Sequence, residues 1–356
     1  MLSELSNKLL KIAVVDDSAL FRGAISSPLE NEPGVEVVGK FRHGQEIVDF
    51  ISKGNEVNLI TLDMEMPVLD GMGALRLIRE KNKKIIIICF SSLTQKGAAK
   101  TIEALTNGAN DFVAKENAES INADLLPKIR AFRDKHCGIS KYQQENLFKA
   151  SKTSFNSNIP MSPRAIVIGS STGGPEALKI VFSDLLPLNI PIFLVQHMPP
   201  IFTTQLAKAL TSSSKIEVIE AENGMQAEAG KCYLAPGNFH MFLKWKDSKA
   251  YIFLNQDEKV CFVRPSVDIL FKSAAEIYGE RLLSIVLTGM GNDGREGARD
   301  IMNRGGSVYI QDEKSCVVWG MPGAIAEASI GARILELENI GSFINNSHIK
   351  KQTTSE

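Results

Sequence analysis

The sequence predicts an α/β protein of two domains, each built on a mostly parallel sheet. Two regions alternate short apolar runs with amphipathic segments, which is the pattern of strands covered by helices. Between them, from about Lys135 to Pro163, the composition shifts to Ser, Asn, Lys and Gln, which indicates a linker. A chain of 356 residues is long enough for two domains that each bury a core.

We expect a first domain over residues 1–133, a linker over 134–163, a second domain over 164–344 and a polar tail over 345–356. Within the linker, Tyr142–Ala150 has the spacing of a short helix.

The composition excludes several classes of protein. A hydrophobic content of 44% and a charged content of 23% are those of a soluble globular protein. The net charge of −1 provides no overall field for nucleic acid or an anionic membrane, and no apolar run approaches the ~20 residues that span a bilayer. The N-terminus does not complete a signal-peptide pattern, so we expect a cytoplasmic protein. Five cysteines without CxxC pairing fit reduced thiols better than disulfides or zinc ligands.

The first domain reads as five strands separated by amphipathic segments such as Ala19–Leu29 and Gly71–Glu80. The expected strands are Ile12–Val15, Val35–Lys40, Leu59–Leu62, Ile85–Phe90 and Asp111–Ala114. Polar side chains follow four of them, at the carboxyl ends where open parallel sheets hold their sites. These side chains are Asp16, Asp17, Asp63, Ser91 and Lys115.

Three carboxylates at one sheet edge repel one another unless a cation lies among them, and Mg²⁺ suits such oxygen ligands. A lysine and a hydroxyl beside them can hold phosphoryl oxygens. For any single acid, capping of the following helix is the more ordinary interpretation. That interpretation does not account for all five groups together.

The motifs around these residues resemble those of a known family. The Asp16-Asp17 pair, LITLDMEMPVLDG around Asp63, CFSS around Ser91 and GANDFVAK around Lys115 occur in the order found in response-regulator receiver domains. The resemblance covers about residues 10–133 and implies a flavodoxin-like (βα)5 receiver domain.

By this resemblance, Asp63 accepts a phosphoryl group from a histidine kinase. Mg²⁺ is then held by Asp16, Asp17, Asp63 and the main-chain carbonyl of Glu65, while Ser91 and Lys115 contact the phosphoryl group and Phe112 is the aromatic switch residue. The family usually has a proline after the lysine, often in a cis bond, but this chain has Glu116. A cis bond before a non-proline residue costs about 2.5–4 kcal/mol, so we expect the loop after Lys115 to differ.

The second domain opens with RAIVIGSSTGGP, in which a buried strand, Ala165–Ile168, runs into a glycine-rich turn and a helix. Ser171 lies on this turn in the pattern Gly-x-Ser-x-Gly of a nucleophile elbow. The alternatives are a structural turn or a phosphate-binding loop. A dinucleotide site is disfavoured because Ser171 replaces the second glycine and the next strand ends in Gln196-His197. The turn alone leaves nucleophile and structural turn equally open.

The alternation then continues as a doubly wound α/β domain with an inserted antiparallel hairpin. The expected elements are strands at Ile192–Gln196, Cys232–Ala235 and Leu282–Leu287, a helix at Thr203–Leu210, and hairpin strands at Met241–Trp245 and Tyr251–Leu254.

Strand ends again carry reactive side chains. His197 follows the second strand and Asp293 lies in a glycine-rich loop after Leu287, so Ser171, His197 and Asp293 can form a relay of nucleophile, base and orienting acid. His197 could instead cap its strand, Asp293 could be a turn residue, and His240 is a competing base. The chain order Ser, His, Asp differs from the Ser, Asp/Glu, His order of ordinary α/β-hydrolases.

Six motifs together resemble the chemotaxis receptor methylesterase family, in order: GSSTGGPEAL, VQHMPPIFT, YLAPGNFHM, RPSVDILF, LTGMGNDG and QDEKSCVVWGMP. The resemblance implies that Ser171, His197 and Asp293 are catalytic and that Thr172 and Met290 shape the oxyanion site and the histidine environment. Arg264–Asp268 and His240 match family motifs without an assigned step.

The resemblance further implies a protein-glutamate methylesterase and protein-glutamine glutaminase that acts on methyl-accepting chemotaxis receptors. Its phosphodonor is a chemotaxis histidine kinase, its Mg²⁺ belongs to the receiver, and the esterase site needs no cofactor. Neither nucleic-acid binding nor membrane insertion is expected, and the unphosphorylated receiver is expected to restrain the esterase. The rival interpretations are a scaffold with a silent second half and a stress-pathway regulator that acts through partner binding alone.

Overall fold

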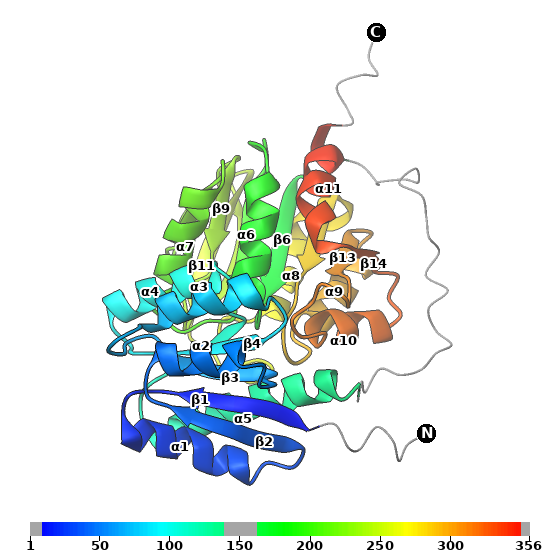
Figure 1. The fold of residues 1–356 in the computed structure, drawn as a ribbon. Helices are drawn as coiled ribbons and strands as arrows, with labels where there is room; N and C mark the ends of the chain where they lie inside the picture. The colour runs from blue at the N-terminus through cyan, green and yellow to red at the C-terminus, as the bar shows by residue number, and fades with distance from the viewer. Residues whose placement is uncertain (1–8, 139–161, 350–356) are drawn as a thin grey trace. The chain divides into compact units, whose positions relative to one another are not determined.

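The computed structural model describes residues 9–138 and 162–349 (Figure 1). The chain separates into two compact units, divided between Lys141 and Tyr142. The expected helix at Tyr142–Ala150 and most of the expected linker lie outside the described residues.

The N-terminal unit is a five-stranded parallel sheet with the strand order β2-β1-β3-β4-β5. Its strands are β1 (Leu10–Val15), β2 (Val35–Phe41), β3 (Leu59–Asp63), β4 (Ile86–Ser91) and β5 (Asp111–Ala114). Its helices are α1 (Ala19–Glu30), α2 (Gly44–Ser52), α3 (Gly71–Lys81), α4 (Gln95–Leu105) and α5 (Ala118–His136). Helices α1 and α5 pack together on one face, and α3 packs between α2 and α4 on the other. The expected (βα)5 fold is confirmed.

Local sequence explains where these helices begin. The side chains of Ser18, Asp70, Thr94 and Asn117 each precede a helix and accept a hydrogen bond from a backbone N–H of its first turn. Such caps satisfy donors that have no partner within the helix. Helix α5 continues to His136, a few residues into the expected linker.

The C-terminal unit contains a seven-stranded parallel sheet with the order β14-β13-β12-β6-β7-β9-β8 and a separate antiparallel hairpin, β10-β11. Its strands are β6 (Ala165–Ser170), β7 (Ile192–Gln196), β8 (Glu217–Glu220), β9 (Lys231–Leu234), β10 (His240–Lys246), β11 (Lys249–Asn255), β12 (Leu282–Val286), β13 (Ser307–Gln311) and β14 (Arg333–Leu335). Its helices are α6 (Gly174–Asp184), α7 (Phe202–Ser213), α8 (Val267–Tyr278), the short 3₁₀ helix η2 (Gly279–Arg281), α9 (Arg295–Asn303), α10 (Met321–Glu327) and α11 (Leu337–Ile349).

The large sheet is covered on both faces, as a doubly wound fold requires. Helix α6 packs against α7 and α11, whereas α8 packs against α9 and against the hairpin strand β10 (Figure 1). The hairpin contributes Met241, Leu243 and Ile252 to the core that α8 shares with the sheet. The hairpin therefore acts as a cover for the α8 face and not as a strand pair of the sheet.

Strand β6 lies at the centre of this sheet, between β7 and β12. The chain goes from β6 to β7 on one side and returns to β12 on the other, so the strand order reverses at β6. Ligands of open α/β sheets bind at such reversals, beyond the carboxyl ends of the strands. In the N-terminal unit β1 has the same place between β2 and β3.

The expected mostly parallel sheet and hairpin are confirmed, and several elements extend or add to the prediction. Strands β8, β13 and β14 were not anticipated, although SVYIQ of β13 has strong β propensity. Helix α11 runs through residues 345–349, which were expected to be tail.

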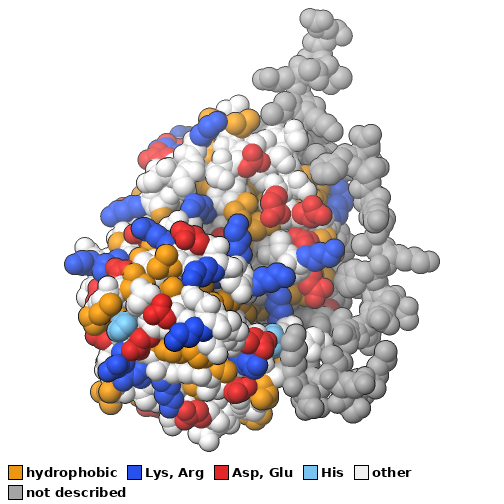
Figure 2. All heavy atoms as spheres, in the orientation of Figure 1, with side chains coloured by type: hydrophobic (Ala, Val, Ile, Leu, Met, Phe, Trp, Pro, Cys, Tyr) orange, Lys and Arg blue, Asp and Glu red, His pale blue; other side chains and the backbone are white. Residues whose placement is uncertain are grey.

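One face of the molecule carries charges of both signs. On the face drawn in Figure 2, basic and acidic side chains are interspersed and neither sign gathers into one large patch. Among the described residues, no helix is both long and apolar enough to cross a membrane.

Candidate functional site

An acidic cluster lies at the carboxyl end of the N-terminal sheet. Asp16 and Asp17 follow β1, Asp63 ends β3, and their carboxylate oxygens lie within 4.8 Å of one another. Asp16 and Asp63 are buried, whereas Asp17 is exposed. Three hard oxygen donors at this separation, one of them open to solvent, fit a divalent cation such as Mg²⁺.

Lys115 supplies the positive charge beside this cluster. Its Nζ lies 2.6 Å from Asp16 Oδ2 and 2.8 Å from Asp63 Oδ2. Burial, together with the charge of Asp16, raises the pKa of Asp63 above its usual value even though Lys115 and the backbone N–H of Glu65 act in the opposite direction. Asp63 is thus a buried carboxyl with little direct support from hydrogen-bond donors.

The other residues predicted for this site lie around it. The N–H of Glu65 donates to Asp63 Oδ1 at 3.2 Å, while the Glu65 side chain is 3.6 Å from Lys100 Nζ. Ser91 is buried at the end of β4. Phe112 is buried on β5, and its carbonyl accepts a hydrogen bond from Lys128 Nζ. The bond before Glu116 is trans, since the cis bond among the described residues is Arg264–Pro265.

In the C-terminal unit, Ser171 lies on a tight turn between β6 and α6. Its N–H donates to the Thr288 carbonyl at 3.0 Å, and its carbonyl accepts from Gly174 N at 2.8 Å and from Gln196 Nε2 at 2.9 Å. A Cβ on Gly174 would lie 2.0 Å from Gln196 Oε1, so only glycine permits this approach. The turn is therefore held by the ends of two neighbouring strands.

His197 follows β7 directly, and its N–H donates to the Ser170 carbonyl at 3.0 Å. Its Nε2 lies 2.8 Å from Asp293 Oδ2, and the His197 side chain is only 9% exposed. The structure thus brings two of the three predicted relay residues into direct contact and places the third on the adjacent strand end.

Asp293 lies in the loop between β12 and α9 and is 2% exposed. Apart from His197, four donors bond to its carboxylate: Ser266 Oγ at 2.8 Å, Val267 N at 2.6 Å, Asp268 N at 3.0 Å and Gly294 N at 3.0 Å. Burial favours the neutral acid, but the hydrogen bond and charge of His197 and these N–H groups outweigh it and hold the pKa of Asp293 below its usual range. These contacts therefore favour the ionised form of Asp293.

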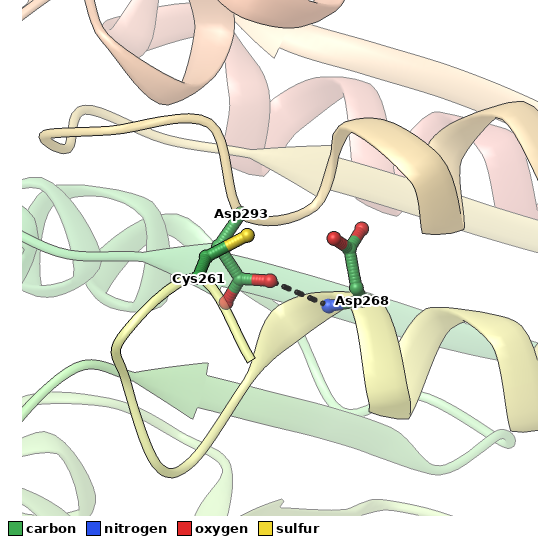
Figure 3. A group of neighbouring side chains, drawn as sticks. All are labelled: Cys261, Asp268 and Asp293. Carbon is green, nitrogen blue, oxygen red and sulfur yellow. Dashed lines mark hydrogen bonds between the residues drawn. The ribbon is translucent and has the colours of Figure 1, made fainter. Parts of the chain in front are cut away.

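Two of those N–H groups belong to the first turn of α8. Asp293 therefore caps a helix that precedes it by 26 residues in sequence, and it benefits from the positive end of the helix dipole. Cys261 and Asp268 lie next to it (Figure 3), and ligand atoms of the three groups are within 4.8 Å of one another. Both Asp293 oxygens accept hydrogen bonds and Asp268 Oδ1 accepts one from Gly297 N, so these two carboxylates are already engaged by donors of the protein.

Thr172 and Met290 border the turn from two sides. Thr172 is buried, and its carbonyl accepts from Thr288 Oγ1 at 2.9 Å. Met290 lies in the loop after β12, next to Gly289, where a Cβ would lie 2.8 Å from Ser171 Cβ. The loop after β12 therefore approaches the serine closely.

The competing base, His240, has a structural position. It is 1% exposed at the start of β10, and its Nε2 bonds to the Glu258 carbonyl at 3.0 Å. Arg264 donates to the carbonyls of Gln256 and Asp257 and to the side chain of Asn238. Both residues fix the segment between the hairpin and α8.

Gln196, Thr288 and Ser266 support the site, although none of them was assigned a role from the sequence; Ser266 lies within Arg264–Asp268, which was noted only as a motif match. Gln196 stands in the VQH motif directly before His197, so its strand-end position offered a signal. Thr288 and Ser266 bond through tertiary contacts that no local pattern reveals.

Comparisons with known proteins agree with the two-unit architecture. The profile of the response regulator receiver domain matches residues 12–125, and that of CheB methylesterase matches residues 166–344. A protein from Thermotoga maritima is 40% identical over 93% of this chain and 96% of its own length, and one from Nocardioides sp. is 39% identical over 94% of both; each is named protein-glutamate methylesterase/protein-glutamine glutaminase. The crystal structure of the Thermotoga maritima CheB methylesterase catalytic domain is similar with a TM-score of 0.51 and 41% identity, covering 52% of this chain and 98% of that one.

Proposed function

The chain belongs to the CheB methylesterase family, and we propose that it hydrolyses γ-glutamyl methyl esters and deamidates glutamines on chemotaxis receptors through Ser171, His197 and Asp293. The observation that carries this proposal is the contact of His197 with a fully bonded Asp293, beside a serine on a strand-to-helix turn. A catalytically inactive second domain would not require an ionised acid in contact with a histidine at this position.

Ser171 Oγ attacks the ester carbonyl, and His197 takes the hydroxyl proton. Because Asp293 occupies Nε2, the nitrogen left for this proton is Nδ1. The tetrahedral intermediate collapses as the imidazolium returns the proton to the leaving methoxide, so methanol departs and an acyl-enzyme remains. Water, deprotonated by His197, then releases free glutamate and restores Ser171. With a glutamine substrate the leaving group is ammonia.

The tetrahedral intermediate needs hydrogen-bond donors for its oxyanion. The N–H of Ser171 already donates to the Thr288 carbonyl, so it is not the donor. We assign this role to the neighbourhood of Thr172, the residue after the nucleophile, and of Met290 in the loop that approaches Ser171.

In the N-terminal unit, Asp63 is the phosphoacceptor, and a chemotaxis histidine kinase is the phosphodonor. Asp16, Asp17, Asp63 and the Glu65 carbonyl would hold Mg²⁺, which supplies positive charge for the incoming phosphoryl group. Lys115, which already bridges Asp16 and Asp63, would contact the phosphoryl oxygens together with Ser91. Phe112 on β5 would then transmit the change to the surface of the unit.

These assignments correspond to a receiver over residues 1–133, a linker over 134–163, a catalytic domain over 164–344 and a tail over 345–356. The division of the chain between Lys141 and Tyr142 and the two profile matches support this organisation. A cytoplasmic protein that meets its receptors at the membrane surface fits this organisation. The net charge of −1 does not favour nucleic acid as a partner.

Methanol release from membranes that carry a receptor with radiolabelled methyl esters tests the proposal. We expect release by the wild-type chain and none above background by Ser171→Ala. The matched control is Ser183→Ala, which removes an exposed hydroxyl from α6 and should release methanol at the wild-type rate. Near-normal release by Ser171→Ala would contradict the covalent mechanism.

A further inference from the structure

A second carboxyl lies directly beside Asp293. Asp268 stands in the first turn of α8, and its N–H donates to Asp293 Oδ1 at 3.0 Å (Figure 3). Its own Oδ1 accepts a hydrogen bond from Gly297 N at 2.7 Å, in the first turn of α9. The proposed reaction assigns no role to Asp268.

The two acids cap each other's helices. Asp293 precedes α9 but accepts from the first turn of α8, whereas Asp268 belongs to α8 and accepts from the first turn of α9. The helices are very close here, because a Cβ on Gly297 would lie 2.5 Å from Phe271 Cβ and 3.2 Å from Asp268 Cα. This exchange fixes the loop that carries Asp293 between two helix N-termini.

The environments of the two acids shift their pKa values in opposite directions. Burial and the charge of Asp293 raise the pKa of Asp268 to about 6, against the hydrogen bond from Gly297, while the pKa of Asp293 lies below its usual range. Other titratable or charged groups that face this pair are His197, Cys261 on the turn before α8, and Arg295 and Glu296 on α9. Arg295 and Glu296 form an ion pair with each other, and Glu296 also pairs with Arg299.

We infer that Asp268 is a positioning residue for the Asp293–His197 pair, and that its negative charge favours the imidazolium that forms when His197 takes the proton of Ser171. This inference rests on the proposed esterase function. An ionised Asp268 adds a second negative charge on the side of His197 that holds Asp293, and so stabilises the transition state. A protonated Asp268 retains the hydrogen bond from Gly297 through its carbonyl oxygen but loses the charge.

The test compares the turnover number, kcat, of the wild-type chain with that of Asp268→Asn between pH 5 and 8.5. Both proteins are full length, treated with acetyl phosphate and Mg²⁺, and assayed on membranes with radiolabelled receptor methyl esters. The asparagine keeps an acceptor for Gly297 N–H and removes the charge. We expect equal kcat near pH 5, where the wild-type Asp268 is neutral, and a wild-type advantage of about 3–10-fold at pH 8 with KM unchanged. The ratio at each pH isolates the part of the pH dependence that differs between the two proteins.

Three further variants test whether the charge of Asp268 causes the difference in kcat. Glu276→Gln removes the same charge from an exposed position of α8, and its kcat should equal the wild-type value at every pH. Asp268→Ala also removes the acceptor of Gly297 N–H, so its kcat should be lower at both ends of the pH range. Asp268→Ser, a second neutral variant with a hydroxyl acceptor, replaces Asp268→Asn if the asparagine variant does not fold.

Thermal unfolding separates this role from a merely structural one. A carboxyl whose pKa is raised on folding opposes the folded state increasingly as the pH rises from its unfolded value to about 6. Above pH 6, Asp268→Asn should therefore unfold at a higher temperature than the wild type while turning over more slowly. A lower unfolding temperature together with a kcat ratio independent of pH would overturn the inference. If the wild type released no methanol, or Ser171→Ala released it normally, the proposed function itself would fail.

Discussion

Asp63 and Asp293 are both buried aspartates at the carboxyl edge of a parallel sheet, yet their environments favour opposite states. Asp63 has one lysine and one N–H as direct partners, and burial raises its pKa. Asp293 has five donors, and its pKa falls although it is equally buried. The hydrogen-bond donors and the neighbouring charges, Asp16 beside Asp63 and His197 beside Asp293, separate the two, and not burial.

This difference fits the different roles proposed for the two carboxylates. The proposed phosphoacceptor must exchange its present partners for the incoming group, and Asp63 has two of them, Lys115 Nζ at Oδ2 and Glu65 N at Oδ1. A carboxylate that orients a histidine must hold one position and one charge throughout the reaction, as the bonding of Asp293 enforces. Under the proposed function, similar sheet edges serve phosphoryl acceptance in one unit and proton relay in the other.

The largest expected effect comes from substitutions of the nucleophile and the base of the proposed catalytic site. We expect Ser171→Ala and His197→Ala each to lower turnover by roughly 10⁴–10⁶-fold, because a serine hydroxyl is a poor nucleophile without its base. The double variant should be little worse than either single one, since the residues act as a unit. Initial rates of methanol release give these values, with circular dichroism to verify folding. Loss of activity in His240→Ala but not in His197→Ala would show that His240, and not His197, is the base.

Asp293→Asn tests whether the ionised state of this acid matters. We expect turnover to fall on the order of 10⁴-fold, as in serine proteases, because an asparagine can hold the wrong histidine tautomer. The asparagine NH₂ would also face N–H donors that now bond to a carboxylate oxygen. The matched change in the other unit, Asp63→Asn, should abolish labelling by acetyl phosphate but leave basal turnover intact. Equal loss of basal turnover in both variants would contradict the contrast between the two acids.

The close approach of the loop after β12 to the nucleophile predicts an intermediate effect. In Gly289→Ala the new Cβ would lie 2.8 Å from Ser171 Cβ and 2.4 Å from Met321 Sδ, so the serine must shift. We expect kcat to fall by about 10²-fold, the size of effect that a displacement of ~1 Å produces. Gly23→Ala, on α1 with nothing within 4 Å of the new Cβ, should leave kcat unchanged and stabilise its helix by about 0.5–1 kcal/mol. Steady-state kinetics give kcat for both variants. Equal values would contradict the expectation that the new Cβ displaces Ser171.

The smallest effect concerns the coupling of the two units. We expect a chain that begins near Pro160 to turn over about 10–100-fold faster than the unphosphorylated full-length protein and to ignore acetyl phosphate, which corresponds to a shift of ~1.4–2.7 kcal/mol in a two-state equilibrium. Methanol release measured at equal molar concentrations gives the ratio. Lower activity after truncation would instead mean that the receiver recruits substrate or activates the esterase directly.

Much of the fold could be predicted because polar residues interrupt apolar runs at the ends of strands. Asp16, Asp63, His197 and Ser171 all stand where a buried strand stops, and the structure places each at the edge of its sheet. The hairpin was anticipated from its two apolar runs, although its strands extend further, to Lys246 and from Lys249.

The rest depends on contacts between segments distant in sequence. Two of the donors that lower the pKa of Asp293 are N–H groups at the start of α8, and nothing near Asp293 in the sequence predicts that this helix begins beside it. Strand β14 has only three residues, too few for a periodic signal. The position of Lys115 between two carboxylates likewise requires β5 to follow β4 in the sheet, which a list of strands alone does not specify.

The most direct test of the account measures methanol release from methylated receptor membranes with and without acetyl phosphate and Mg²⁺, in the wild type, Asp63→Asn and Ser171→Ala. The account predicts that the phosphodonor accelerates the wild type by about 10–100-fold. It also predicts that Asp63→Asn keeps the basal rate without acceleration and that Ser171→Ala releases nothing above background in either condition. Acceleration of Asp63→Asn to the wild-type level, or release by Ser171→Ala, would contradict it.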